Sequence, residues 1–211
     1  KCNLMNGVVH FIGFSVKKFK DEYQLYLYMD DNNMCDLDKY IKSDKLWINT
    51  PKKYVLSDDI KKQISIDLCK NLIELHNSNI VHCDYKTSNI VIDDKNNTKI
   101  IDLEASIVLS DNTERCHPNI GTQGYMAPEI IEGYCSVKSD IYSLGVVLIE
   151  LWNGRLWRTD SDDYDVSRND VLLALREIKY HYSHLEKILR RCILKDCTKR
   201  PKISTILKYF D

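Results

Sequence analysis

The sequence predicts a mixed α+β fold that is mostly helical, because three patterns recur along its 211 residues. Two short runs rich in β-branched residues, Ile90–Ile92 and Thr98–Ile101, flank a polar turn and predict a β-hairpin. Two further runs near the start, Val8–Phe14 and Tyr23–Met29, predict another pair of strands. Apolar residues at helical spacing dominate much of the remaining chain, so helices are expected to form most of the molecule.

The first predicted elements are the strands Val8–Phe14 and Tyr23–Met29, with the charged stretch Lys17–Glu22 as the turn between them. A short helix is expected over Asp36–Ile41, and a polar insertion follows it over Lys42–Leu56. These elements would precede the first long helix of the chain.

The first long helix is predicted to begin after Ser57, which is a suitable N-cap residue. Asp58 and Asp59 follow it, and their negative charge is favourable at the positive end of a helix dipole. Apolar side chains then recur every three or four residues and predict a face that packs in the core: Ile60, Ile64, Leu68, Leu72 and Leu75.

The second half of the chain is predicted to be helical. Ser136 would cap a helix over Val137–Asn153, and Gly154 would end it. Arg155–Ser167 is polar and is expected to be a loop. The remaining apolar patterns predict three helices: Asp170–Ile178, Ser183–Lys195 and Ile203–Phe210.

The stretch from His82 to Glu104 carries groups that suit phosphoryl transfer. Asp84 could orient an attacking hydroxyl and accept its proton, and Lys86 could reach a transferring phosphate as a point charge. Asn89 and Asp102 flank the predicted hairpin, which would bring them close together. Both offer the hard oxygen ligands that magnesium prefers, so they could hold Mg²⁺ against a nucleotide.

Three motifs in order carry a family resemblance. His82-Cys83-Asp84, with Lys86 and Asn89, resembles the catalytic loop of eukaryotic protein kinases, His-Arg-Asp-x-Lys-x-x-Asn. Asp102-Leu103-Glu104 stands where that family has Asp-Phe-Gly, and Gly121–Glu129 resembles the end of its activation segment, including the Ala-Pro-Glu triplet. An isolated His-x-Asp is more often a turn than a catalytic site, whereas the ordered set is specific.

The resemblance implies a protein-kinase-like fold, represented mainly by the helical C-terminal lobe and the last strands of the N-terminal lobe. Residues 1–211 would form a single, partial protein kinase domain, with a remnant of the small lobe and the hinge in 1–29 and the large lobe in 30–211. Tyr28 and Met29 would meet the adenine of the nucleotide. A Gly-rich loop and a strand lysine for the phosphates would precede Lys1.

The function that the resemblance implies is an ATP-dependent serine/threonine protein kinase, which transfers the γ-phosphate to protein hydroxyls. Asp84 would be the catalytic base and Lys86 the phosphate contact, and both Asn89 and Asp102 would bind Mg²⁺ and nucleotide. ATP and Mg²⁺ are therefore the expected cofactors, and a protein substrate is the expected partner. Thr122, expected near Asp84 and Lys86, favours the serine/threonine class.

Three further residues have structural roles by the same resemblance. Asp140, on the Val137–Asn153 helix, would hold the backbone of the catalytic loop by hydrogen bonds. Arg200 would form a buried ion pair with Glu129. Such a pair is costly to break, since the remaining partner stays buried without compensation.

Two departures from the family pattern leave alternatives open. Cys83 replaces an Arg that pairs with a phosphate on the activation segment, so alanine at Ser106, Ser110 and Thr113 is expected to leave activity largely intact. Glu104 replaces a Gly beside the predicted metal site. Both departures are compatible with a pseudokinase or interaction module. A small-molecule phosphotransferase is a remote alternative, suggested by Asp102-Leu103-Glu104.

Composition narrows the partners and the compartment. The formal net charge is -1, which does not suggest binding to nucleic acid through a basic surface. No apolar run approaches the roughly 20 residues that span a bilayer, and no signal peptide is visible at Lys1, so no membrane partner is expected. The eight cysteines are scattered without a Cys-x-x-Cys pair, which favours reduced thiols in a cytoplasmic protein over a disulfide framework or zinc site.

Overall fold

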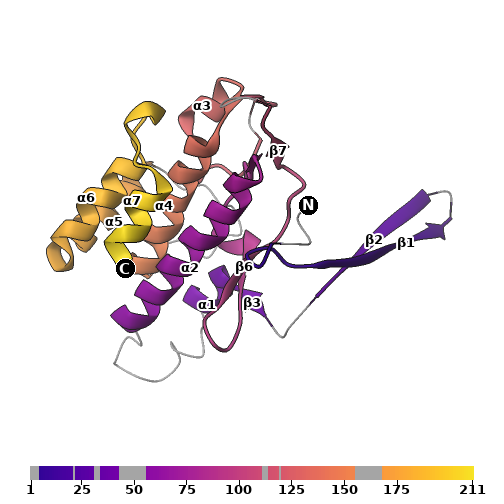
Figure 1. The fold of residues 1–211 in the computed structure, drawn as a ribbon, viewed down its shortest axis with the longest axis horizontal. Helices are drawn as coiled ribbons and strands as arrows, with labels where there is room; N and C mark the ends of the chain where they lie inside the picture. The colour runs from indigo at the N-terminus through magenta and orange to yellow at the C-terminus, as the bar shows by residue number, and fades with distance from the viewer. Residues whose placement is uncertain are drawn as a thin grey trace.

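A computed structural model of the chain describes residues 5–20, 22–30, 34–42, 56–110, 114–118, 120–154 and 168–211. These residues form a helical body and a long two-stranded ribbon that extends away from it (Figure 1). The mixed α+β class predicted from the sequence is therefore confirmed. Among the described helices, none combines the length and the apolar character needed to cross a bilayer.

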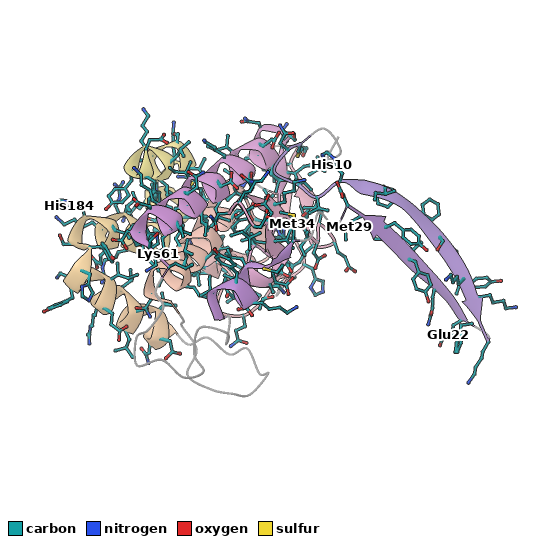
Figure 2. The ribbon with its side chains drawn as sticks, turned by 90° about the horizontal axis from the view of Figure 1, so that it is seen from below. His10, Glu22, Met29, Met34, Lys61 and His184 are labelled. Carbon is teal, nitrogen blue, oxygen red and sulfur yellow. The ribbon has the colours of Figure 1, made fainter. Side chains whose placement is uncertain are left out.

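The ribbon pairs β1 (Phe11–Phe19) with β2 (Glu22–Met29) in antiparallel register. Its far end carries Glu22, while Met29 lies where the ribbon joins the body (Figure 2). The predicted turn over Lys17–Glu22 is wrong at its start, because β1 continues through Phe19. Lys17 and Lys18 lie over the rings of Tyr26 and Tyr23 on the opposite strand, and these contacts favour pairing over a turn.

The polar hairpin of the body forms as predicted. The strands β5 (Ile90–Ile92) and β6 (Thr98–Ile100) pair antiparallel, and β3 (Cys35–Asp36) pairs with β5 on the other side. The chain before the ribbon also joins this sheet, since Val8 forms a parallel bridge to Ile100. Helix α1 (Leu37–Lys42) follows β3 and lies one residue later than the predicted helix.

Two long helices form the centre of the body. Helix α2 (Asp58–Asn77) begins as predicted, because the Ser57 hydroxyl accepts a hydrogen bond from the Ile60 N–H at 3.3 Å. Helix α4 (Val137–Asn153) begins with a reciprocal cap, in which the side chains of Ser136 and Ser139 each accept a backbone N–H. Gly154 ends α4 in a left-handed conformation with φ 88°, also as predicted.

The C-terminal helices pack against α2 and α4 (Figure 1). Their bounds are α5 (Arg168–His181), α6 (Ser183–Cys192) and α7 (Ile203–Phe210), with the 3₁₀ turn η4 (Cys197–Lys199) before α7. Helix α7 matches its predicted range, whereas α5 is longer and α6 shorter than predicted. The predicted loop Arg155–Ser167 and residues 43–55 of the predicted insertion lie outside the described residues.

Several short elements lie on either side of the hairpin in the chain, between α2 and α4, and none of them was predicted. The strand β4 (Ile80–Val81) pairs with β7 (Ile107–Val108), and β8 (Glu114–Arg115) pairs with β9 (Tyr134–Cys135). Helix α3 (Pro128–Ile131) lies between β8 and β9. Elements of two to four residues are too short for a periodic pattern, so the sequence carried little signal for them.

Two apolar clusters form the core. The larger one joins α2, α4, the C-terminal helices and the hairpin, and contains the predicted stripe residues Ile64, Leu68, Leu72 and Leu75, all of which are fully buried. The smaller one, called the second apolar cluster below, lies under the segment between Asp102 and α4. Its buried members are Val81, Cys83, Leu109, Ala127, Ile130 and Cys135.

Candidate active site

The loop that carries Asp84 is held from below by Asp140, a fully buried residue of α4. One carboxylate oxygen of Asp140 accepts the backbone N–H of His82 at 2.8 Å, and the other accepts that of Cys83 at 3.0 Å. The ring of His76, on α2, lies 2.8 Å from the same carboxylate. The structural role predicted for Asp140 is therefore confirmed, since it fixes the backbone immediately before Asp84.

The loop turns sharply at Cys83, whose φ of 65° lies in the left-handed region. Gly121 approaches it closely from the later segment. A Cβ atom at Gly121 would lie 2.5 Å from the carbonyl oxygen of Cys83, and the φ of Gly121 is 100°. Only glycine permits this approach, which brings Thr122 beside the loop.

Asp84, Lys86, Asn89 and Thr122 converge on one point. The Lys86 ammonium lies 2.9 Å from Asp84 Oδ2 and donates to the Thr122 hydroxyl at 2.7 Å. The Asn89 side chain donates to the same Asp84 Oδ2 at 3.1 Å and to the Asp84 carbonyl at 3.0 Å. Among the residues that the structure describes, none forms a hydrogen bond with Asp84 Oδ1, which is buried. The Asp84 carboxylate is therefore held through Oδ2 alone.

Asn89 and Asp102 lie at the open end of the β5–β6 hairpin, as the sequence predicts. The Ile101 N–H donates to the Asn89 carbonyl at 3.0 Å, which ties the two ends of the hairpin together. Asp102 adopts a left-handed φ of 58° and is exposed. The side-chain amide nitrogen of Asn89 donates to Asp84. The side-chain oxygen of Asn89, Oδ1, is therefore the atom that could bind a metal ion.

The side-chain oxygens of Asn89 and Asp102 suit Mg²⁺ better than they suit a metal ion that is coordinated by protein ligands alone. Among the residues that the structure describes, no group of three or more His, Cys, Asp or Glu side chains could hold a metal ion. One amide oxygen and one carboxylate are the sparse, hard donors that Mg²⁺ accepts when substrate phosphates and waters complete its coordination. Asn89 and Asp102 therefore suit an ion that arrives with a nucleotide.

Glu104 lies beside this pair and is exposed. Its backbone N–H lies 3.4 Å from Asp102 Oδ1, so the backbone at this position faces the predicted metal ligand. Ser106, one of the three residues at which alanine is expected to leave activity largely intact, donates its hydroxyl to the His82 carbonyl at 3.3 Å. Thr113, another of them, lies outside the described residues.

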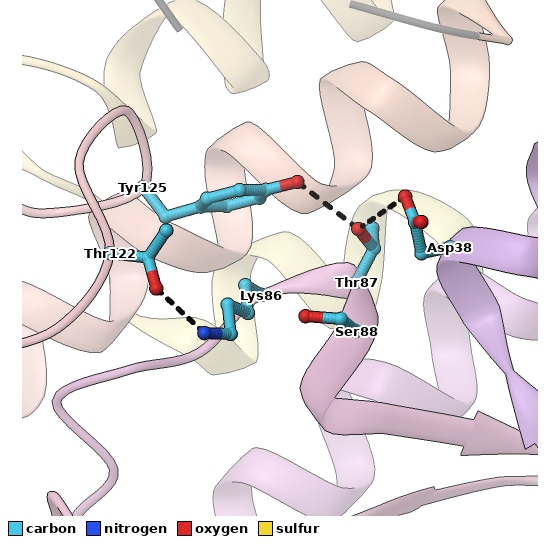
Figure 3. Close-up of a pocket in the computed structure, with 6 residues that line it drawn as sticks. All are labelled: Asp38, Lys86, Thr87, Ser88, Thr122 and Tyr125. Atoms are coloured by element: carbon cyan, nitrogen blue, oxygen red, sulfur yellow. Dashed lines mark hydrogen bonds between the residues drawn. The ribbon is translucent and has the colours of Figure 1, made fainter. Parts of the chain in front are cut away.

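A pocket of about 110 Å³ opens next to Lys86 and Thr122 (Figure 3). The Thr87 hydroxyl lies in its wall, 3.4 Å from an Asp38 carboxylate oxygen and 3.1 Å from the Tyr125 hydroxyl. Its full lining is Asp38, Lys86, Thr87, Ser88, Thr122 and Tyr125. Sequence reasoning missed Asp38 and Tyr125, because only the folded chain brings α1 to the catalytic loop.

Tyr28 and Met29, predicted to contact the adenine, are the last two residues of β2, and Met29 lies at the base of the ribbon (Figure 2). About half of each side chain is exposed, and the Tyr28 hydroxyl is hydrogen-bonded to Ser15 across the ribbon at 2.9 Å. The structure thus groups Asp84, Lys86 and Asn89 tightly, whereas these two residues belong to a separate element.

The ion pair predicted between Arg200 and Glu129 is present and bidentate. The two guanidinium nitrogens lie 2.6 and 2.7 Å from the two carboxylate oxygens of Glu129, and Ser139 also donates to Glu129 at 2.8 Å. Burial by itself would raise the pKa of Glu129, but the hydrogen bonds and charge of Arg200 hold that pKa below its usual value. The pair anchors the end of the segment that carries Thr122.

Three cysteines that are far apart in the sequence meet under this segment. Cys83 and Cys135 are buried members of the second apolar cluster, and Cys116 packs against this cluster. All three are free thiols. The sequence showed only scattered cysteines, and no local spacing could have indicated this cluster.

Comparison with known proteins places the chain among kinases. The family described as protein kinase domain matches residues 2–210. The Arabidopsis thaliana protein named probable serine/threonine-protein kinase PBL4 is 32% identical over 167 residues, covering 69% of this chain and 40% of that protein. Another, named PBL28, is 30% identical over 191 residues, covering 87% of this chain and 48% of that protein.

A protein of Dictyostelium discoideum, also named a probable serine/threonine-protein kinase, is 29% identical over 182 residues. That alignment covers 83% of this chain and 19% of the relative. The chain therefore spans less than half the length of each of these three relatives.

Proposed function

This chain belongs to the protein kinase family, and we propose that it is an ATP-dependent serine/threonine kinase acting on protein hydroxyls. The observation that carries the proposal is the contact of one ammonium group, that of Lys86, with both Asp84 and Thr122. This contact joins a general base, a phosphate-binding cation and the segment beside which a substrate would lie. The printed names of the relatives, serine/threonine-protein kinases, support the same class.

In this mechanism Asp84 is the central group. Its carboxylate would accept the hydrogen bond of the substrate hydroxyl and orient the hydroxyl oxygen for attack, while Lys86 and Asn89 fix the position of the carboxylate through Oδ2. Lys86 would also offset negative charge on the transferring phosphoryl group. Asn89 and Asp102 would hold Mg²⁺, which would neutralise charge on the nucleotide phosphates.

The proposal is tested by Asp84→Asn in the complete protein. Phosphate transfer from ATP to casein is expected to fall by about 10²–10⁴-fold, the usual contribution of a positioned general base. Asp94→Asn is the matched control, because Asp94 is an exposed turn residue between β5 and β6. If Asp84→Asn retained as much phosphate transfer as Asp94→Asn, the assignment of Asp84 as the general base would be refuted.

A kinase-like interaction module without catalysis is the second candidate, and the position of Glu104 favours it. This exposed carboxylate sits two residues from Asp102 and would add negative charge where a nucleotide's phosphates must lie. Thermal shift with ATP and Mg²⁺ separates the two candidates. Magnesium-dependent stabilisation that Asp102→Asn abolishes would support the enzyme, and its absence in the complete protein would support the module.

A small-molecule phosphotransferase remains the remote alternative. The contact between Lys86 and Thr122, the Arg200–Glu129 pair and the loop-holding Asp140 are protein-kinase features that count against it. We also propose a protein substrate, with no nucleic-acid or membrane partner, and a cytoplasmic location. The near-neutral net charge and the free thiols support these parts of the proposal.

A further inference from the structure

The thiol cluster of Cys83, Cys116 and Cys135 joins three separate stretches of chain. Cys135 lies on β9, and Cys116 follows β8, whose residues pair with β9. Glu114 is opposite Cys135, and the Cys116 N–H donates to the Gly133 carbonyl. Residues two apart on a strand point to the same face, so Cys116 and Cys135 lie on the same face of the β8–β9 pair. Cys83 reaches this region from the catalytic loop and is buried in the second apolar cluster together with Cys135.

Cys83 is the residue immediately before Asp84, and its backbone is already held on two sides. Its N–H donates to Asp140 of α4, and its carbonyl oxygen lies against Gly121. Its side chain is the third attachment. The thiol lies 3.8 Å from the Val81 carbonyl and packs into the second apolar cluster together with Cys135. A shift of the Cys83 side chain would therefore shift the backbone that presents Asp84.

The cluster is held together without charge. Burial raises the pKa of all three thiols: that of Cys135 rises to about 11, and those of Cys83 and Cys116 also lie above their usual value. All three are therefore protonated at neutral pH. Leu109, Ala127 and Ile130 surround them, so the contact is an apolar one.

We propose that Cys135 is a positioning residue for Asp84, acting through Cys83, and that the thiol cluster ties the catalytic loop to the segment after Asp102. A neutral contact of this kind needs no phosphate on the segment to form. The inference rests on the proposed role of Asp84 in phosphoryl transfer. Its structural part, the coupling of Cys135 to the loop, can be measured whether or not the protein is active.

Cys135→Ala and Cys192→Ala form a matched pair for this measurement. Both remove the sulfur from a thiol that is almost fully buried, but Cys192 lies on α6 in the larger apolar cluster. Amide hydrogen exchange of a peptide spanning His82 to Asp84 is the readout. We expect Cys135→Ala to speed exchange there about tenfold, which corresponds to about 1.4 kcal/mol, and Cys192→Ala to leave it unchanged relative to amides of α2.

Cys116→Ala extends the test if Cys135→Ala does not fold. Cys116 is only half-buried, so its loss is milder, and a smaller rise in exchange at the same peptide is expected. The exchange rate at His82–Asp84 is compared between Cys192→Ala and the cluster variant that folds. Equal rates would overturn the coupling of the thiol cluster to the catalytic loop.

Kinetics on the complete protein test the catalytic part. In Cys135→Ala, the kcat for casein phosphorylation should fall while the KM for ATP stays near its original value, because Asp84 is misplaced but the nucleotide site is not. Cys192→Ala should change neither constant. Faster exchange with an unchanged kcat would overturn the positioning role. If Asp84→Asn also leaves activity intact, the proposed function fails instead, and the exchange result for the cluster still stands.

Discussion

The catalytic loop and the β1–β2 ribbon belong to the same chain, yet they are held in opposite ways. The loop rests on Asp140, a fully buried residue of the body, and Arg200, which is only 2% exposed, anchors the neighbouring segment through Glu129. The ribbon instead exposes large apolar side chains, with Ile12 71% and Leu25 62% exposed, and within the described part of the chain its strands pair only with each other. A two-stranded hairpin is marginal by itself in water. Substitutions in the body should therefore affect folding strongly, and those in the ribbon weakly.

The largest effect is expected at Arg200. Arg200→Met leaves the Glu129 carboxylate partly buried without its bidentate partner, and the free energy of unfolding should fall by about 3–5 kcal/mol. Urea denaturation measures it. Lys199→Met is the neighbouring control, because the Lys199–Asp196 pair is exposed and its loss should change stability little. A loss as small at Arg200 as at Lys199 would mean that the body is not held by this pair.

The same pair makes stability depend on pH in a defined direction. Because the pKa of Glu129 is lowered on folding, its ionised form stabilises the native state above its usual pKa of 4.5. That contribution is lost as the pH falls through the lowered value. The difference in unfolding free energy between the wild type and Arg200→Met should be greatest near neutral pH and shrink below about pH 4.5. A difference that is constant with pH would show that the ion pair is not its source.

The parts of the fold that were predictable are those with local causes. Ser57 and Ser136 cap their helices through hydrogen bonds to residues two or three positions away, and Gly154 ends α4 by its own backbone freedom. The hairpin around residues 93–97 follows from a polar turn between two β-branched runs. The turn predicted over Lys17–Glu22 was wrong at Lys17–Phe19, because Tyr23 and Tyr26, which contact these lysines and favour a strand, lie on the opposite strand.

The residues of the site also divide into those with a local signal in the sequence and those placed by contacts between distant segments. Asp84, Lys86, Asn89 and Asp102 lie in one motif of about twenty residues, so their spacing identified them and the structure brings the first three into contact. The pocket wall at Asp38 and the packing of Cys135 with Cys83 depend on chain segments about 50 residues away from the loop. Such contacts arise from packing between elements, and no periodic or spacing signal encodes them.

Two buried tyrosines test how completely the buried polar groups of the body are hydrogen-bonded. The hydroxyl of Tyr85 is buried and has no hydrogen-bond partner among the described residues, whereas that of Tyr125 donates to Glu150 at 2.5 Å. Tyr125→Phe should therefore destabilise the protein by about 1–3 kcal/mol, since it leaves a buried acceptor with one donor fewer. Tyr85→Phe removes an unsatisfied group and should be neutral or stabilise by about 1 kcal/mol.

Thermal and urea unfolding of the two variants measure whether each substitution lowers or raises the free energy of unfolding. The substitution removes the same oxygen atom in each case, so differences in side-chain volume cancel. A destabilising Tyr85→Phe would indicate that its hydroxyl has a partner, such as an internal water, and that the core around the catalytic loop is more completely hydrogen-bonded than the protein atoms alone suggest.

The smallest effect is expected in the ribbon, and it decides whether the comparison holds. Leu25 lies opposite Val16 on an exposed face, so Leu25→Ser should change the unfolding free energy of the body by less than about 0.5 kcal/mol. Leu72→Ala, in the fully buried stripe of α2, should cost about 2–5 kcal/mol by contrast. Urea unfolding followed by far-UV circular dichroism compares them. A cost at Leu25 close to that at Leu72 would mean that the ribbon is buried in solution and unfolds together with the body.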